Sequence, residues 1–287
     1  MQQIFVGDVQ GCADELDEVV ERAGREFGDA FELWLVGDLV NRGPASRRAL
    51  ERVRELERAG RARVVLGNHE LALLRVAYGQ RAPAPDDTFQ ELLGRDRDTW
   101  LDWIRGWPLA LSGQLGARRF AMVHAAVSPE WRLPDLEAKA RRVEARLRSS
   151  REEASRLLAA EPADDPDADV LARVTRCRSV DARGRWSSRP PARPDDAWHR
   201  RWAAHGHDYG VVYGHWALQG LHVAPMLRGL DSGCVYHGFG RDGFLTAWLP
   251  RSDAREPFAV PDEHFWRIPA RGLYWRGDSS SASVDST

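Results

Sequence analysis

Apolar and polar positions along the first 80 residues form three repeats of a strand followed by a helix. Continuous apolar runs predict short buried β-strands at residues 2–6, 31–36 and 63–66. Apolar residues three and four positions apart predict a helix after each strand, at residues 14–23, 46–60 and 71–78. Ser46 is the predicted N-cap of the second helix. This alternation predicts parallel strands joined by right-handed crossovers.

The rest of the chain shows further strand patterns on either side of a segment with a different composition. Apolar runs predict strands at residues 119–123, 209–213, 226–230 and 244–249. A short amphipathic helix is expected at residues 100–107, where Pro108 ends it.

From about residue 130 to residue 204, Arg, Glu and Ala dominate and apolar residues become sparse. We interpret this segment as a helical cap inserted into a single domain of residues 1–276. Clusters of Pro and Asp at residues 162–169 and 190–196 predict at least one mobile loop in the cap. The Ser-rich residues 277–287 predict a disordered tail.

Composition and charge exclude several classes of protein. The 287 residues, 43% of them hydrophobic, are sufficient for a full globular core. A formal net charge of −2 provides no basic field for duplex DNA. No apolar run approaches the length of a membrane span, and the N-terminus lacks a signal-peptide pattern. We therefore expect a soluble cytoplasmic protein with no membrane partner.

The three cysteines, Cys12, Cys177 and Cys234, are odd in number and far apart, with no C-x-x-C spacing. This pattern argues against a disulfide framework or a structural zinc site and for a reducing compartment. Cys12 is interpreted as a small packing residue rather than a nucleophile, because no base or strong positive charge lies beside it in the sequence.

Five predicted strands are followed by side chains that can bind a metal ion: Asp8, Asp38, Asn68, His124 and His215. Ligands of open α/β sheets gather at the carboxyl ends of the strands, so we expect these side chains to lie close together. Carboxylate oxygens combined with neutral imidazole suit manganese, iron or zinc better than calcium. The sequence therefore predicts a metal centre at the sheet edge.

Two further residues have the chemistry that phosphoryl transfer requires. Two ions a few ångströms apart can ionise water and neutralise the charge that develops on a phosphoryl group. His69, directly after Asn68, is placed to protonate a leaving oxygen. Arg42, in the loop after Asp38, can clamp the nonbridging oxygens of a phosphate.

These residues belong to blocks that resemble, in order, the signature motifs of the calcineurin-like metallophosphoesterases. The blocks lie at residues 7–11, 37–43, 67–70, 123–126 and 214–216. Within this superfamily they resemble the phosphoprotein-phosphatase branch. Residues 37–44, 215–216 and 230–235 are similar to the bacterial symmetrical bis(5′-nucleosyl)-tetraphosphatases, which hydrolyse diadenosine tetraphosphate. Residues 174–178 resemble the T-R-x-R element in the cap of that subfamily.

The resemblance implies a mixed α/β (α+β) fold, in which two packed β-sheets are flanked by helices and the metals lie at the sheet edge. It also implies two divalent metal ions, manganese first, with cobalt, iron, zinc or magnesium as alternatives. One metal would be bound by Asp8 and Gln10, Asp38 would bridge, and the second site would be completed by Asn68, His124 and His215. His69 would be the general acid, and Arg42 and Arg176 would hold phosphate. A surface salt bridge on the charged cap would explain Arg176 equally well.

Two positions depart from the superfamily pattern. Gln10 stands where the superfamily usually has His, and an amide ligand favours harder ions and weakens that metal site. Asn41 stands where protein phosphatases usually have an Asp that orients the catalytic His. Asn41 can orient His69 through a hydrogen bond, but it stabilises imidazolium less well. We interpret both as marks of the subfamily.

Our leading hypothesis is a metal-dependent hydrolase that splits diadenosine tetraphosphate symmetrically into two ADP molecules. Nucleoside-tetraphosphate caps at RNA 5′ ends are a related substrate class. The first alternative is a protein Ser/Thr or Tyr phosphatase of the same superfamily. The second is a non-catalytic nucleotide-binding regulator, motivated by Gln10 and Asn41. The sequence leaves open the choice among these substrates, the physiological metal, the oligomeric state and any motion of the cap.

Overall fold

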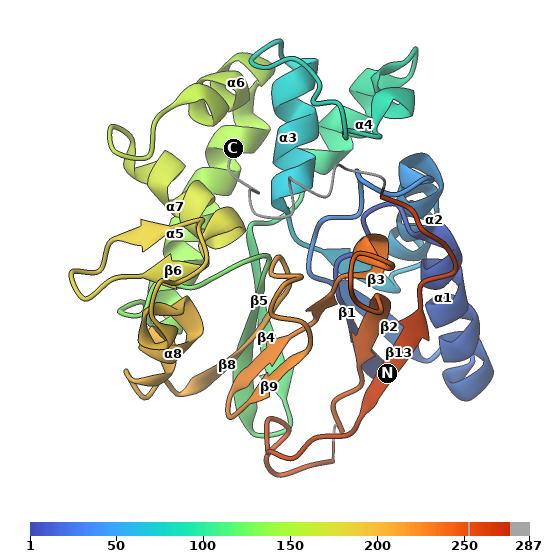
Figure 1. Ribbon diagram of the computed structural model, residues 1–287, viewed down its shortest axis with the longest axis vertical. Helices are drawn as coiled ribbons and strands as arrows, with labels where there is room; N and C mark the ends of the chain where they lie inside the picture. The colour runs from blue at the N-terminus through green and yellow to red at the C-terminus, as the bar shows by residue number, and fades with distance from the viewer. Residues whose placement is uncertain (252, 276–287) are drawn as a thin grey trace.

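Two β-sheets pack face to face, and helices cover their outer faces (Figure 1). The computed structural model describes residues 1–251 and 253–275. Its mixed α/β sandwich flanked by helices confirms the fold class predicted from the sequence.

The first sheet has the strand order β11-β12-β1-β2-β3, and β13 pairs with β12. Its strands are β1 (Gln2–Val6), β2 (Phe31–Leu35), β3 (Ala62–Val64), β11 (Asp231–Ser232), β12 (Phe244–Trp248) and β13 (Phe265–Pro269). The first three strands are parallel, as the strand–helix alternation predicts. Strand β12 runs antiparallel to β1, so the sheet is mixed.

The second sheet has the strand order β4-β5-β8-β10-β9. Its strands are β4 (Ala110–Leu115), β5 (Arg118–Val123), β8 (Tyr209–Tyr213), β9 (His222–Ala224) and β10 (Leu227–Gly229). Strands β5, β8 and β10 are parallel to one another. The structure also contains a small hairpin of β6 (Ser179–Val180) and β7 (Trp186–Ser187).

Alternate side chains of the central strands serve two separate cores. Phe5 of β1 points toward the other sheet, where its ring centroid lies 5.2 Å from that of Phe120 in β5, and Trp34 of the neighbouring strand β2 packs beside it at 5.6 Å. Its neighbours Ile4 and Val6 are buried in the other core, which includes the flanking helices. Because both faces are buried, the strands appear as continuous apolar runs rather than alternating ones.

Helices α1 (Ala13–Phe27) and α2 (Ser46–Arg58) cover the outer face of the first sheet, on the right in Figure 1. Beyond β3 follow α3 (Asn68–Ala77), the 3₁₀ turn η1 (Gln90–Leu93) and α4 (Arg97–Ile104). A further 3₁₀ turn, η3 (Cys234–Tyr236), follows β11.

The predicted cap region is largely helical. It contains α5 (Leu133–Ser149), α6 (Arg151–Ala159), α7 (Pro166–Arg176), α8 (Trp198–Ala203) and the 3₁₀ turn η2 (Pro194–Asp196). Helices α5, α6 and α7 pack against one another, and α6 also contacts α3. The cap therefore lies against the helix that carries Asn68 and His69. The boundaries of a single domain at residues 1–276 stay a prediction.

The local structure differs from the sequence-based expectations at three points. Ser46 is the first residue of α2 rather than its N-cap, because its hydroxyl accepts a hydrogen bond from the backbone N–H of Asn41 at 2.9 Å. The expected loop at residues 162–169 is partly helical, since Asp165 caps α7 and Pro166 occupies a first-turn position that suits proline. Strands β4, β9 and β13 were missed because they are short or have few buried positions. The predicted disordered tail lies outside the described residues.

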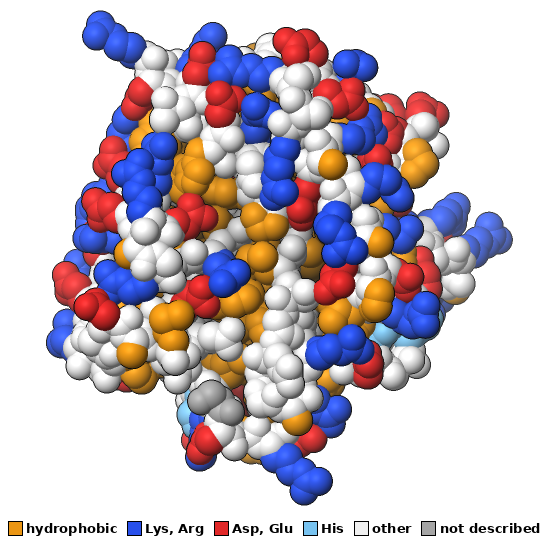
Figure 2. All heavy atoms as spheres, turned by 180° about the vertical axis from the view of Figure 1, so that it is seen from behind, with side chains coloured by type: hydrophobic (Ala, Val, Ile, Leu, Met, Phe, Trp, Pro, Cys, Tyr) orange, Lys and Arg blue, Asp and Glu red, His pale blue; other side chains and the backbone are white. Residues whose placement is uncertain are grey.

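Acidic and basic side chains are interspersed on the face of the molecule shown in Figure 2. This mixing agrees with the small net charge of −2. In the part of the chain that the structure describes, no helix combines the length and apolar character needed to span a membrane.

The cap contacts the second sheet through a pair of histidines, one of them buried. His199 of α8 is 8% exposed, and its ring centroid lies 4.4 Å from that of His222 in β9. Nε2 of His199 lies 2.8 Å from the amide nitrogen of Gln219, which can only donate, so this imidazole is neutral. Burial, followed by the charge of His222, lowers the pKa of His199 to about 3.

The lowered pKa of His199 should make the fold sensitive to acid. The unfolded chain protonates this histidine near its ordinary pKa of about 6.5, so the contribution of neutral His199 is complete above that pH and is lost as pH falls toward 3. Between pH 6.5 and 5 the loss should reach about 2 kcal/mol. Urea unfolding of the His199→Gln variant should show a correspondingly weaker pH dependence. His205→Gln, a change of an exposed histidine beyond the same helix, should keep the wild-type dependence, and equal slopes in all three proteins would contradict the assignment.

Candidate active site

The carboxyl ends of five parallel strands from both sheets meet at one place. Asp8 follows β1, Asp38 follows β2, and Asn68 begins α3 after the short loop that follows β3. His124 follows β5 and His215 follows β8 in the second sheet. The sequence predicted a common sheet edge, and the structure builds it from two facing sheets.

Distances between ligand atoms show how closely these side chains converge. Nε2 of His124 lies 3.2 Å from Oδ2 of Asp38 and 3.0 Å from Oδ1 of Asn68. Nδ1 of His215 lies 2.8 Å from the same Asn68 oxygen. One ligand atom from each of Asp38, His124 and His215 lies within 4.8 Å of the other two, and all three residues are predominantly buried.

Backbone carbonyl groups determine which imidazole nitrogens face this centre. Nδ1 of His124 lies 2.8 Å from the carbonyl oxygen of Val36, and Nε2 of His215 lies 3.2 Å from that of Arg176. A carbonyl oxygen only accepts, so each ring donates its N–H there and turns the lone pair of its other nitrogen toward Asn68. Lone pairs of two imidazoles, an amide oxygen and a carboxylate therefore converge. This arrangement fits a divalent cation.

Negative charge at the centre strengthens the case for a cation. Asp8 is 4% exposed, and both of its oxygens accept the backbone N–H of His215 at 3.1 Å. Burial and then the charges of Asp231 and Asp38 raise the pKa of Asp8 well above its usual range. Burial likewise raises the pKa of Asp231 to about 6. Like charges buried together need a positive partner, which bound metal ions would supply.

The two histidines that face Asn68 differ in the direction of their pKa shifts. Burial opposes a charge on His124, but the Asp38 carboxylate outweighs burial and raises the pKa of His124. For His215, burial followed by the charge of Arg178 lowers the pKa well below its ordinary value. Without a metal ion, Asp38 attracts a proton to His124. A bound cation would take that place.

Gln10 lies in the loop that is attached to the backbone of Asp38. The N–H groups of Val9 and Gln10 donate to the Asp38 carbonyl at 3.1 and 2.7 Å, and the Gln10 carbonyl accepts the N–H of Gly43 at 2.9 Å. Gln10 is 4% exposed. The structure therefore places this predicted ligand beside Asp38.

Five of the predicted site residues have a left-handed backbone that is uncommon for side chains other than glycine. The φ angles are 45° for Gln10, 50° for Asp38, 81° for Asn41, 65° for Arg42 and 70° for His215. Such conformations cost free energy and persist where the surrounding structure holds them, commonly at functional sites.

Glu70 holds this strained region, and the sequence interpretation missed it. Its buried carboxylate accepts the backbone N–H groups of Asp38 and Gly67 at 2.9 Å and of Leu39 at 2.8 Å. Burial and then the Asp38 charge raise the pKa of Glu70 to about 7. The available sequence signal was the spacing of Gly67 and Glu70, which is that of an N-cap and the third residue of a helix.

His69 is oriented by Asn41 and by Asp87, which the sequence interpretation also missed. Oδ1 of Asn41 accepts the backbone N–H groups of Arg42 and Thr88 at 2.8 and 2.9 Å, so its amide NH₂ must point the other way. This NH₂ group lies 2.8 Å from Oδ1 of Asp87 and 2.9 Å from Nδ1 of His69. Nδ1 therefore accepts, and neutral His69 carries its proton on Nε2, which lies 3.8 Å from Oδ2 of Asp38.

The two predicted phosphate-binding arginines are placed differently. Arg42 forms an ion pair with Asp86, which leaves its side chain 12% exposed. The carbonyl of Arg176 accepts from His215, so this residue lies next to the centre. Its guanidinium forms no ion pair with the residues that the structure describes, and burial followed by the charge of Arg178 lowers the pKa of Arg176. The surface salt bridge considered as its alternative role is therefore not observed.

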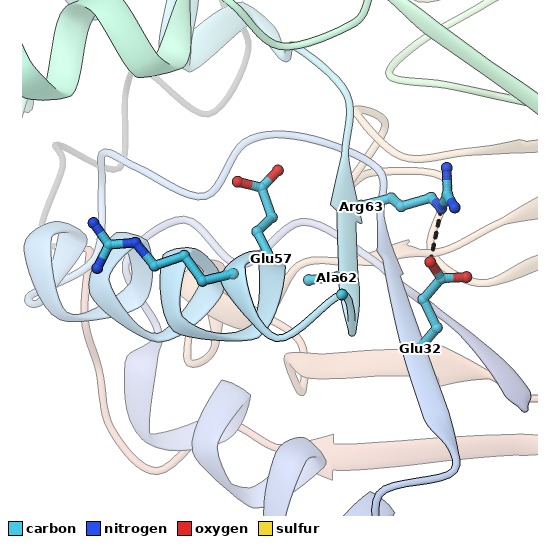
Figure 3. A pocket seen from close by; sticks show the side chains of 6 residues that line it. Glu32, Glu57, Ala62 and Arg63 are labelled. Atoms are coloured by element: carbon cyan, nitrogen blue, oxygen red, sulfur yellow. Dashed lines mark hydrogen bonds and ion pairs between the residues drawn. The ribbon is translucent and has the colours of Figure 1, made fainter.

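A surface hollow elsewhere on the molecule is not part of this centre. It is lined by Glu32, Glu57, Arg58, Gly60, Ala62 and Arg63 (Figure 3). It lies near the starts of β2 and β3, whereas Asp38 and Asn68 follow the ends of those strands. Nε of Arg63 pairs there with Glu32 at 2.7 Å.

Comparisons with known proteins agree with this geometry. The family model of calcineurin-like phosphoesterases matches residues 1–241. The chain is 36% identical over 267 residues to a symmetrical bis(5′-nucleosyl)-tetraphosphatase of Janthinobacterium, covering 83% of this chain and 90% of that protein. It is 40% identical over 252 residues to a protein of the same name from Aromatoleum aromaticum, covering 80% and 89%. A crystal structure described as that of a candidate diadenosine tetraphosphatase has a TM-score of 0.55 and 24% identity, covers 96% of this chain and 95% of that one, and supports the fold.

The close packing of glycines against the site carboxylates can be tested by adding one methyl group. A Cβ at Gly214 would collide with Oδ1 of Asp8. Gly214→Ala should displace this carboxylate and lower turnover by about 10²-fold or more, since misplacing a catalytic group by about 1 Å has that effect. Gly24→Ala, in α1 where a Cβ meets no atom within 4 Å, is the matched control and should keep wild-type turnover. Wild-type kinetics for Gly214→Ala would contradict the role of this packing.

Proposed function

The chain belongs to the calcineurin-like phosphoesterases, and from this premise we propose that it hydrolyses diadenosine tetraphosphate symmetrically to two molecules of ADP. The choice of substrate rests on the 36–40% identity, over most of the chain, to proteins named symmetrical bis(5′-nucleosyl)-tetraphosphatases. The convergence of lone pairs from Asp38, Asn68, His124 and His215 supports metal-dependent hydrolysis as the chemistry.

The donor set suits two divalent ions. Asp8 and Gln10 would hold one ion, Asp38 would bridge, and Asn68, His124 and His215 would hold the other. When bound, these ions supply Lewis-acid activation of water and neutralise charge on the phosphoryl oxygens. Imidazole combined with carboxylate and amide oxygens suits manganese, which we propose as the physiological ion.

His69 acts on the leaving group in this proposal. Its Nε2–H is directed by the Asn41 amide and donates a hydrogen bond to the departing phosphate oxygen. Cleavage at the centre of the tetraphosphate releases ADP, whose terminal phosphate has a second pKa of only about 6. Such a leaving group departs as an anion, so hydrogen bonding suffices and complete proton transfer is unnecessary.

The same argument disfavours a protein Ser/Thr phosphatase. A serine alkoxide is a far stronger base than a phosphate, so its departure requires a protonated histidine. Imidazolium would direct an Nδ1–H at the NH₂ group of Asn41, where two donors would face each other. The network of Asn41 and Asp87 therefore suits a phosphoanhydride.

Arginines near the centre provide positive charge for the polyphosphate. Arg176 lies beside His215, and burial followed by the charges of Arg176 and Arg81 lowers the pKa of Arg75 to about 10. Mutual repulsion between guanidinium groups favours an anion between them. We propose that Arg176 binds one end of the polyphosphate and that Arg42 binds the other after exchanging Asp86 for phosphate.

Product identity tests the proposed reaction directly. Purified protein supplied with Mn²⁺ and diadenosine tetraphosphate should yield two equivalents of ADP for each substrate consumed, resolved by ion-exchange chromatography. ATP together with AMP, or the absence of turnover, would contradict the symmetric assignment. Tight nucleotide binding without turnover would instead support the non-catalytic regulator.

Exchanging the amide and the carboxylate beside His69 tests the leaving-group argument. The double variant Asn41→Asp with Asp87→Asn keeps every acceptor for the N–H groups of Arg42, Thr88 and Ala84, but it presents an acceptor to Nδ1 of His69. Imidazolium should then be stabilised, and turnover of a phosphoserine peptide relative to the dinucleotide should rise at least about tenfold. Asn41→Ala is the control and should slow both substrates. If the double variant left the ratio of phosphopeptide to dinucleotide turnover unchanged, the result would contradict the role of Asn41 and Asp87 in selecting the leaving group.

Three finer points stay predictions within this proposal. Nucleoside-tetraphosphate caps of RNA present the same phosphoanhydride chemistry and are the second substrate class that we propose. Manganese as the resident metal and the cytoplasm as the compartment are likewise proposed, on the donor set and on the unpaired spacing of the three cysteines.

A further inference from the structure

Two cysteines far apart in the sequence meet a glutamate in the core. Cys12 lies directly before α1, Glu15 lies in the first turn of α1, and Cys234 begins η3. One sulfur from each cysteine and one carboxylate oxygen lie within 4.8 Å of one another. The residues are 1%, 0% and 1% exposed, in chain order. The spacing in the sequence gave no sign of this cluster.

The Glu15 carboxylate is only half satisfied. Oε1 accepts the backbone N–H of Arg271 and the hydroxyl of Tyr274, both at 2.7 Å. Oε2 is buried and has no hydrogen-bond partner among residues 1–251 and 253–275. The guanidinium of Arg271 pairs with Glu18 at 2.7 Å and leaves the charge of Glu15 without that counterion. A buried carboxylate oxygen without a partner is costly and needs an explanation.

Ordinary packing of two neutral thiols does not provide that explanation. A thiol is a weak donor, and neither thiol forms a hydrogen bond with Oε2. The arrangement instead brings together two soft sulfur ligands and one hard oxygen ligand around a shared space. Sulfur and carboxylate ligands in such a set suit zinc, which binds Cys sulfur at about 2.3 Å and carboxylate oxygen at about 2.0–2.2 Å.

We propose that Cys12, Cys234 and Glu15 form a zinc site separate from the metal centre at the sheet edge. On binding, both thiols release their protons to solvent, and the thiolates with the carboxylate ligate the ion. The Tyr274 hydroxyl donates to the Glu15 carboxylate and fixes the orientation of this ligand. This site revises the sequence-based argument against structural zinc.

The position of the site in the fold indicates a structural role, in which it connects the loop after β1 to the turn after β11. Cys12 follows Gln10 by two residues and donates its backbone N–H to the Val9 carbonyl at 2.9 Å. Cys234 follows Asp231 by three residues, and Asp231 contributes to the raised pKa of Asp8. The zinc ion ties these two loops to each other and, through Glu15, to the segment that contains Arg271 and Tyr274. It supports the edge of the active centre without touching the substrate.

Cobalt substitution distinguishes this site from the one at the sheet edge. The proposed ligands of the catalytic centre are nitrogen and oxygen atoms, so thiolate-to-cobalt charge-transfer absorption in the near ultraviolet distinguishes the site of Cys12 and Cys234 from it. The full chain, stripped of metal and reloaded with Co²⁺, should show this absorption and intense visible bands of a tetrahedral ion. Addition of one equivalent of Zn²⁺ should abolish the thiolate absorption. A wild-type spectrum without it would overturn the proposal.

Variants then assign the ligands. Cys234→Ser should lose the thiolate absorption by at least half and lower zinc content, measured by elemental analysis, by about one ion per chain. Glu15→Gln, which keeps the side-chain shape, should weaken zinc binding about 10-fold or more and serves if the cysteine variant does not fold. Cys177→Ser changes a buried cysteine outside the cluster and should keep both the spectrum and the zinc content. Wild-type zinc content and spectra in Cys234→Ser and Glu15→Gln would overturn the assignment.

Discussion

The structure depends on balancing the negative charge of carboxylates that are buried at one sheet edge. Asp8, Asp38, Glu70 and Asp231 are each at most 5% exposed, and the pKa values of Asp8, Glu70 and Asp231 are raised, by burial first. The imidazoles of His124 and His215 each direct one ring nitrogen toward the same volume. A folded chain keeps such a group of acceptors only when cations or backbone N–H groups balance it. The left-handed residues, the close packing of Gly214 and the backbone N–H groups that Glu70 accepts all serve that balance.

Hydrogen bonds around the centre explain why the two departures from the superfamily pattern, Gln10 and Asn41, are compatible with catalysis. Gln10 stands in place of a histidine, and its loop is hydrogen-bonded to the backbone of Asp38 beside the centre. Asn41 replaces a carboxylate, and Asp87 lies behind it at 2.8 Å. A carboxylate is therefore retained, but the side chain of Asn41 lies between it and His69. This displacement makes His69 a hydrogen-bond donor, which suits an anionic leaving group better than an alkoxide.

Local patterns were sufficient to find the side chains that converge at the sheet edge. A buried strand, a glycine and a polar residue form a signal within about ten residues, because a parallel strand must deliver its next side chain to the carboxyl edge. Asp8, Asp38, Asn68, His124 and His215 were found in this way, and the structure brings them together. Their roles as ligands, and those of His69 and the arginines, stay predictions that rest on chemistry.

The sequence by itself determined the strand–helix order, the two-sided burial of the central strands and the identity of the residues at their ends, because each depends on neighbours along the chain. Only the tertiary structure decided which distant groups complete the centre. Glu70 binds the loop after β2, Asp87 directs Asn41, Asp86 holds Arg42, and Glu15 meets Cys234 across more than 200 residues. Such pairings follow from how two sheets and a cap pack, and packing depends on contacts between segments whose spacing in the sequence carries no information about their distance in space.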